Sequence, residues 1–140
     1  IQDQILPNLR RSEITLKGEL TSFSDDQIKE FAKSNPDTLS REELLYAATM
    51  TDDLDEKMAI YATYSKLHTD DWRGPNNVGY VYIMQNNMDA AKKELDKANS
   101  LSPNNPVVNN NMGVFERSNG DNAKAMEYYA AANGAGSAES

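Results

Sequence analysis

The chain has 140 residues, and its 22 acidic side chains against 14 Lys and Arg give a net charge of −8. The basic residues are scattered, so the sequence shows no basic face of the kind that binds nucleic acid or an anionic membrane surface. It contains no cysteine, which excludes disulfides, thiolate metal sites and a cysteine nucleophile. No apolar run approaches the roughly 20 residues of a membrane-spanning helix, so direct membrane insertion is not expected.

Residues 1–22 are predicted to be the end of an upstream domain. Polar and apolar residues alternate over residues 12–20, which indicates a half-buried strand. No second strand pattern of similar quality follows, so the partners of this strand are expected upstream, in a longer parent protein. The chain starts at Ile1 rather than Met and shows no signal-peptide pattern, which favours the same interpretation.

Every pattern after residue 22 is helical. Two capping-box pairs, Ser24 with Gln27 and Ser40 with Glu43, each predict the start of a helix. The first of these helices is expected to end near Ser34, because the residue that follows precedes a proline. Predicted helices run over residues 24–34, 40–50, 53–68, 74–85, 88–100 and 122–132, with another beginning at 106 and the last one ending at Asn133-Gly134.

A segment of about 34 residues occurs twice in succession, at residues 72–105 and 106–139. A fixed period of this length predicts stacked helical hairpins, none of which can bury its apolar face alone. Small residues are expected where the two helices of a hairpin cross, because a larger side chain would force them apart. The matched positions hold Asn76-Asn77 and Asn110-Asn111, Gly79 and Gly113, Ala91 and Ala125, Leu95 and Tyr129, and Ala98 and Ala132.

These residues resemble the tetratricopeptide repeat, whose pattern includes W-x2-L-G-x2-Y, A-x3-F and a closing proline. The copies depart from the pattern in lacking its tryptophan, and the second copy also departs from it at Glu116 and Ser137. The resemblance implies an all-α, right-handed solenoid of helical hairpins, with a short strand-like segment before it. The matching residues are Val78-Gly79-x2-Tyr82, Ala91-x3-Leu95, Ala98 and Pro103 in one copy, and Met112-Gly113, Ala125-x3-Tyr129 and Ala132 in the other.

The resemblance also divides the chain into units. Residues 1–22 precede the solenoid, and residues 23–37 form an extra helix. Residues 38–71 form a degenerate repeat, in which Lys57 replaces the small alanine and a looser crossing is expected. Repeats then follow at 72–105 and at 106–140, the second truncated before a further repeat.

A weaker resemblance lies at the N-terminus. The run Leu9-Arg10-Arg11-Ser12-Glu13-Ile14 resembles the closing helix-to-strand step of outer membrane protein A-like peptidoglycan-binding domains. The alternative is an unrelated strand with a basic start. The layout as a whole resembles multi-domain cell-envelope proteins of Bacteroidetes-type bacteria, which implies a periplasmic or outer-membrane-associated location.

In tetratricopeptide arrays the first helix of each hairpin lines a concave groove. The amide and apolar side chains that the resemblance places there suit an extended peptide. The alternative for Asn77 and Asn111 is that they hold neighbouring helices together. The groove lacks lysine, so capture of a carboxylate terminus is not expected. The predicted groove residues are Tyr46, Arg73, Asn76, Asn77, Tyr80, Ile83, Met84, Val107, Asn110, Asn111, Val114 and Arg117, together with Glu42 and Met50 of the degenerate repeat.

The remaining motifs point to structural roles. Asp52-Asp53-x-Asp55-Glu56 could suggest a cation site, but it lacks the sharp glycine turn of a calcium loop, and capping of a helix N-terminus explains it. His68 is the only histidine and has no catalytic partner in the sequence, so a surface position at a helix end is expected. Four tyrosines that recur at helical spacing are expected to pack in the core, namely Tyr61, Tyr64, Tyr128 and Tyr129. No catalytic residue, metal or cofactor is predicted.

The sequence therefore predicts a non-catalytic scaffold or adaptor that binds a protein or peptide partner in its groove. The alternative is an assembly module, in which the exposed ends mediate self-association or packing between domains. The last helix is expected either to fray beyond Ala132 or to be covered in a homo-oligomer.

Overall fold

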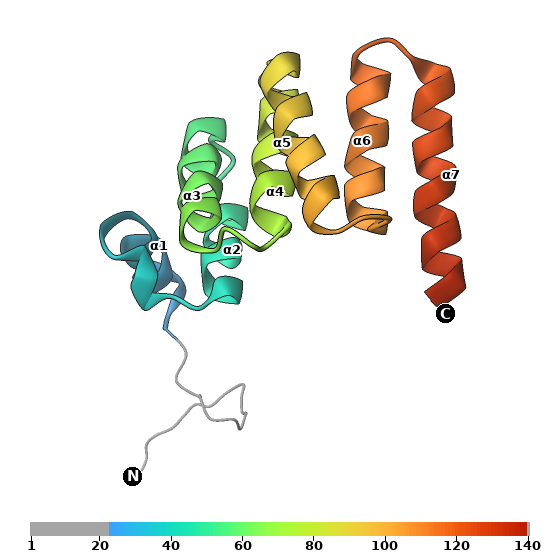
Figure 1. Cartoon of the computed structure of the whole chain (residues 1–140). Coiled ribbons are helices and arrows are strands. Elements are labelled where there is room, and N and C mark those ends of the chain that lie inside the picture. Colours follow the sequence, from blue (N-terminus) through green and yellow to red (C-terminus); the bar gives the residue numbers. More distant parts are fainter. Residues whose placement is uncertain (1–22, 140) are drawn as a thin grey trace.

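The computed structural model describes the backbone of residues 23–139 and the side chains of residues 23–134. This part of the chain is all-α and contains no strand, which confirms the predicted fold class. The helices stand side by side in chain order as successive hairpins (Figure 1). They are α1 (Asp25–Ser34), a short 3-10 helix (Pro36–Thr38), α2 (Arg41–Thr49), α3 (Leu54–Leu67), α4 (Arg73–Met84), α5 (Met88–Leu101), α6 (Pro106–Ser118) and α7 (Asn122–Glu139).

Two predictions concern residues that the structure does not describe. The strand expected at residues 12–20 and the resemblance at residues 9–14 both lie outside the described residues. None of the described helices is long and apolar enough to cross a membrane.

Both predicted capping boxes are formed. The Ser24 hydroxyl accepts from the Gln27 amide at 3.2 Å, and the Gln27 side chain accepts from the Ser24 amide at 2.8 Å. Ser40 and Glu43 repeat this pattern at 3.1 and 2.9 Å. Each pair satisfies two amides that the first turn of a helix would otherwise leave unbonded. The N-termini of α1 and α2 are therefore set by local sequence.

The turns depend on residues that tolerate a left-handed backbone. Asn86 between α4 and α5 has φ of 62°, and Gly120 between α6 and α7 has φ of 93°. These two positions are one repeat apart. Asn104, in the turn between α5 and α6, also has φ of 62°. Asparagine and glycine are the residues that adopt this region most readily, so the sequence sets the turns locally.

Each of the two clear hairpins crosses at a glycine. A Cβ atom built on Gly79 would lie 2.9 Å from Leu95 Cγ, and one built on Gly113 would lie 2.6 Å from Tyr129 Cε1. Both distances are shorter than carbon atoms tolerate, so the helices reach this separation only because the glycines carry no side chain. The expected role of the small residues at the crossings is confirmed.

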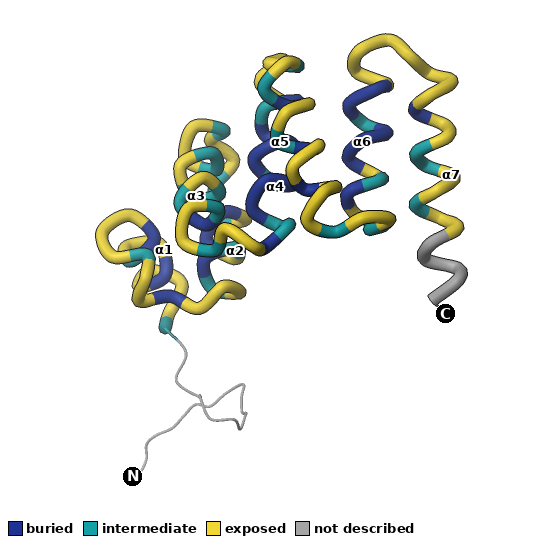
Figure 2. The backbone as a smooth tube through the Cα atoms, in the orientation of Figure 1, coloured by how far each residue is buried: buried dark blue, intermediate teal, exposed yellow. Residues whose placement is uncertain are grey.

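The core consists of two clusters of buried side chains. Figure 2 marks the buried residues along the backbone of the helices. One joins α1, α2 and α3, and it includes Leu44 and Tyr64, neither of which is exposed at all. The other joins α4, α5 and α6, and Tyr128 of α7 packs against it. Its buried members are Ile83, Ala91, Leu95, Ala98, Val108, Met112 and Phe115.

The predicted end of the last helix was wrong. Helix α7 does not stop at Asn133-Gly134 but continues to Glu139. The physical reason is composition: alanine, the strongest helix former, is frequent on both sides of this pair, and no proline follows. A glycine inside a helix costs only about 1 kcal/mol relative to alanine, which neighbouring alanines offset.

Candidate interaction surface on the first helices of the repeats

The predicted groove residues of α4 and α6 form one stripe on each helix. Residues 73, 77, 80 and 84 of α4 are spaced by four, three and four positions, which places them on a single helical face. Residues 107, 110, 114 and 117 of α6 follow the same kind of spacing. Tyr46 of α2, Tyr80 of α4 and Val114 of α6 are separated by one repeat each. The three first helices therefore present equivalent positions to the same side of the solenoid.

Several of these side chains are apolar and unusually accessible. Tyr46 is 43% exposed, Tyr80 39%, Met84 53% and Val107 50%. Scattered exposed apolar residues need no explanation, whereas apolar residues on the same side of adjacent helices, with Tyr46 and Tyr80 at equivalent positions, suggest an interaction surface. We define the first-helix face as nine exposed or half-buried members of the predicted groove, namely Tyr46, Arg73, Asn77, Tyr80, Met84, Val107, Asn110, Val114 and Arg117. Glu42 of α2, also exposed, lies beside this face, 3.9 Å from Arg73.

Three predicted groove residues lie instead in the interior. Ile83 is 6% exposed and packs in the core, and Asn76 and Asn111 are 2% and 9% exposed. The Asn111 side-chain amide donates a 3.0 Å hydrogen bond to Asn76 Oδ1, which joins α4 to α6. For Asn111, this geometry favours the alternative of holding neighbouring helices together. Asn77, by contrast, is half-buried, and its Oδ1 accepts from the Asn76 side-chain Nδ2 at 3.4 Å.

Residues one repeat apart differ in burial because the hairpins stack on one another. Asn76 is buried and its counterpart Asn110 is exposed, and buried Ile83 corresponds to exposed Arg117. Helix α6 covers this side of α4, because residues of α6 share the core cluster with Ile83. In the described residues no further hairpin follows α6 and α7. The same repeat position is therefore interior in one hairpin and accessible in the next.

A buried carboxylate joins α2 and α3 to α4. Asp71, 8% exposed, accepts from the Tyr64 hydroxyl at 2.6 Å and from Arg41 Nη1 at 2.8 Å. It also accepts from Arg73 through the backbone amide at 3.0 Å, Nε at 3.1 Å and Nη2 at 2.9 Å. Arg73 in addition lies 3.9 Å from Glu42, its guanidinium carbon lying 5.9 Å from the centre of the Tyr64 ring. Arg73, at the edge of the first-helix face, is thus held in position.

The pKa values of this cluster reflect its bonding. Burial favours the protonated form of Asp71, but hydrogen bonds from Arg73, Tyr64 and Arg41 outweigh it and hold the pKa of the carboxyl well below its usual range. Burial, followed by the hydrogen bond to the Asp71 carboxylate, raises the pKa of Tyr64 to about 12. The stable state at neutral pH is therefore a neutral phenol donating to an ionised carboxylate.

Sequence reasoning missed this cluster, although one signal was present. Asp71 stands one repeat before Asn105, whose side chain caps α6 by accepting from the Val107 and Val108 amides. Both residues accept from the amide two positions later, where the next first helix begins. Tyr64 stands where the other repeats have Ala98 and Ala132. A tyrosine in a small-residue position of a degenerate repeat could have indicated a polar partner nearby.

Tyr46 is restrained by α1. Its hydroxyl lies 3.2 Å from each of Asp25 Oδ1 and Oδ2 and donates to this carboxylate. That hydrogen bond, more than the charge itself, raises the pKa of Tyr46. Met50, also expected in the groove, lies instead along a cavity between α1 and α3. The extra helix α1 therefore limits how far the first-helix face extends over α2.

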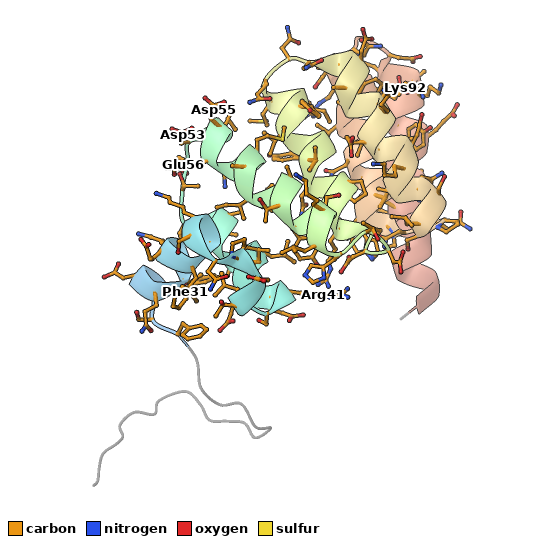
Figure 3. All side chains as sticks on the ribbon, turned by 60° about the vertical axis from the view of Figure 1, so that its left-hand side comes forward. Phe31, Arg41, Asp53, Asp55, Glu56 and Lys92 are labelled. Carbon is orange, nitrogen blue, oxygen red and sulfur yellow. The ribbon has the colours of Figure 1, made fainter. Side chains whose placement is uncertain are left out.

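The acidic run before α3 acts as a cap. Asp53 Oδ1 accepts from the Asp55 amide at 2.9 Å and from the Glu56 amide at 3.3 Å, as predicted for a helix N-terminus (Figure 3). Within the described residues no group of three His, Asp or Glu side chains could hold a metal ion. His68 is the C-cap of α3, so its expected place at a helix end is confirmed. It does not lie on the surface as expected but is half-buried, with its ring 4.9 Å from the ring of Tyr64.

Comparison with known proteins agrees with the repeat geometry. Residues 76–105 match a family model described as a tetratricopeptide repeat. The hairpins described above therefore have a tetratricopeptide-like fold. No curated protein sequence matches the chain.

Two solved structures share this fold. "MamA MSR-1 C2" superposes with a TM-score of 0.63 at 13% identity, over 83% of this chain and 67% of that one. "Crystal structure of MamA" gives a TM-score of 0.63 at 19% identity, over 82% of this chain and 68% of that one. At these identities the likeness concerns the fold.

Proposed function

We propose that the chain is a non-catalytic protein-interaction scaffold that binds an extended peptide segment of a partner on the first-helix face. The observation that carries this proposal is the alignment of exposed Tyr46, Tyr80, Met84 and Val107 on equivalent faces of α2, α4 and α6. The tetratricopeptide-like fold supports it, because such repeats form extended binding surfaces.

The chemistry of the face suits a peptide with mixed side chains. Apolar and aromatic groups supply contact area, and tyrosine in particular combines a rigid ring with a hydroxyl that can bond. Asn77 and Asn110 offer side-chain amides that can pair with the backbone of an extended segment. Arg117, exposed in the last turn of α6, favours a partner with a carboxylate, whereas Arg73 already pairs with Asp71.

The test is a selection from a random peptide library, repeated with variants. Tyr80→Ala combined with Arg117→Ala should abolish enrichment of the sequences that the parent chain selects. The matched control is Leu101→Ala, which removes another exposed apolar side chain at the end of α5, outside the face. Undiminished selection by the double variant, with the same fold by circular dichroism, would contradict the proposal.

Assembly through the end of the solenoid is the second candidate. Met126 of α7 is 66% exposed, more than the other exposed large apolar side chains of the described residues, and lies on the last helix. A second copy or a neighbouring domain could cover it. Sedimentation velocity tests this candidate: Met126→Glu should shift an associating chain to the monomer. If the unsubstituted chain is monomeric over the accessible concentration range, self-association is excluded.

A further inference from the structure

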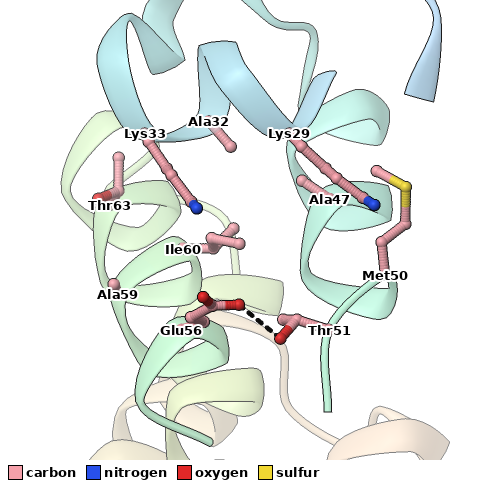
Figure 4. A pocket seen from close by; sticks show the side chains of 10 residues that line it. All are labelled: Lys29, Ala32, Lys33, Ala47, Met50, Thr51, Glu56, Ala59, Ile60 and Thr63. Atoms are coloured by element: carbon pink, nitrogen blue, oxygen red, sulfur yellow. Dashed lines mark hydrogen bonds between the residues drawn. The ribbon is translucent and has the colours of Figure 1, made fainter. Parts of the chain in front are cut away.

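A cavity of about 390 Å³ opens between α1, α2 and α3, and none of its lining residues belongs to the first-helix face. Ala32 of α1, Ala47 of α2, Met50 just after α2 and Ile60 of α3 give it an apolar lining. Figure 4 shows Lys29 and Lys33 extending from α1 into its opening, opposite Glu56. Sites that bind small groups usually have such a volume and a mostly apolar wall with a few polar groups.

The same place in the solenoid recurs two repeats later with different chemistry. Ala47, Thr51 and Glu56 correspond to Phe115, Asn119 and Lys124, which line a cavity of about 540 Å³ between α5 and α7. There the charges are largely paired within the protein. Lys124 lies 3.8 Å from Glu116, and Lys92 lies 3.1 Å from Asp96. The repeat geometry produces both hollows, and the side chains make only the first one apolar.

The two lysines of the first cavity have no counter-charge among the side chains that the structure describes. Lys29 and Lys33 are four residues apart on α1 and share one face, and within residues 23–134 no carboxylate lies within 4.0 Å of either ammonium group. Glu56, the acidic residue of the lining, accepts a 2.6 Å hydrogen bond from the Thr51 hydroxyl. In a chain of net charge −8, two lysines one helical turn apart, without an ion-pair partner in residues 23–134, are an exception to the overall charge.

We propose that this cavity binds an acidic segment of a partner protein. One bulky apolar side chain of the segment rests on Ala47, Met50 and Ile60, and carboxylates about one helical turn away pair with Lys29 and Lys33. Charge complementarity decides the class of partner, because a basic or neutral segment would leave both ammonium groups without a counter-charge. This site is independent of the first-helix face, so a chain could hold two partners on different sides.

The test uses a blocked synthetic helical peptide that carries one leucine with glutamates three and four residues to either side. Titration into methyl-labelled chain should shift the methyl resonances of Ala32, Ala59 and Thr63, and added salt should weaken the binding. Lys29→Glu combined with Lys33→Glu should weaken it about tenfold or more. Ala59→Phe, at an exposed position on the wall, should block the cavity and abolish the shifts.

A control variant distinguishes loss of the two cavity lysines from a general effect of the net charge. Lys66→Glu combined with Lys93→Glu changes the net charge equally, and neither residue lines the cavity. This variant should bind within about twofold of the parent. Equal weakening in both double variants, or no shifts at millimolar peptide, would overturn the proposal. The proposal would also be overturned if decanoate, a fatty acid, shifted the same methyl resonances while the peptide did not. It would equally be overturned if the chain formed a dimer that Ala59→Phe dissociates, because a second copy would then occupy the cavity. Tyr80→Ala should leave this binding unchanged whether or not the first-helix face binds a peptide.

Discussion

Asp71→Asn tests whether the buried carboxylate holds the degenerate repeat onto the next one. The substitution keeps the size of the side chain but removes the charge that Arg41 and Arg73 share. An asparagine oxygen can still accept from Tyr64, whereas its amide group turns two donors towards the guanidinium groups. The cluster then loses its charge-assisted hydrogen bonds while its steric packing is kept.

The expected loss in the free energy of unfolding depends on how exposed the two arginine side chains are. Breaking a buried ion pair costs about 3–5 kcal/mol when the remaining charge stays buried. Here the side chains of Arg41 and Arg73 are 50% and 32% exposed, so water can solvate them once the carboxylate is gone. We therefore expect a lower cost of about 2–3 kcal/mol in the free energy of unfolding. That is a large share of the roughly 5–15 kcal/mol that stabilises a domain.

Urea denaturation gives the measurement. Trp72, the single tryptophan, directly follows Asp71 and packs against the core, so its fluorescence reports on this junction. The matched control is Asp70→Asn, an exposed neighbour whose loss should change the free energy of unfolding by less than about 0.5 kcal/mol. A change equally small for Asp71→Asn at pH 7 would refute the reasoning.

The pH dependence provides a second check on Asp71. Because its pKa is lower in the folded chain than in the unfolded chain, the stabilisation is present above the unfolded value of about 4 and is lost as pH falls through the folded value. The difference between the parent and Asp71→Asn should therefore shrink as pH falls below about 4. A difference that stays constant down to pH 2 would show that the carboxylate charge is not its source.

Three further substitutions test the packing and the titration of the fold. Gly79→Ala places a methyl against the fully buried Leu95 and should lower the free energy of unfolding, measured in urea, by about 1–2 kcal/mol. Gly134→Ala, where an added Cβ has no atom within 4 Å, should raise it by up to about 1 kcal/mol. Asn111→Ala leaves a buried amide oxygen unbonded and should cost about 1–3 kcal/mol, with exposed Asn110→Ala near zero as its control. The raised pKa of Tyr64 stabilises the folded chain below pH 10, and this contribution should be lost between pH 10 and about 12 in the parent but not in Tyr64→Phe. Each argument would be contradicted if the variant and its control changed the free energy of unfolding equally, for Gly79→Ala against Gly134→Ala or for Asn111→Ala against Asn110→Ala. The Tyr64 argument would be contradicted if the stability of the unsubstituted chain and of Tyr64→Phe fell in the same way above pH 10.

Local features could be predicted well because few residues decide them. The boxes at Ser24 and Ser40, the cap at Asp53 and the turn at Asn86 each depend on side chains within a few positions. The end of α7 could not be predicted, because a mildly unfavourable Asn-Gly pair competes with alanines over several turns. The Asp71 cluster was also missed, since its members come from α2, α3 and α4 and share no short motif.

The sequence by itself determined the order of the helices, the predicted caps and turns, and the glycine crossings of the two clear hairpins. These features depend on contacts inside one repeat, which the 34-residue period makes visible. Only the tertiary structure decided which matched side chains are accessible. Asn76 and Asn110 occupy the same repeat position, yet one is bonded in the interior and the other faces solvent. The physical reason is that the next hairpin buries a first helix, so accessibility depends on what stacks beside it.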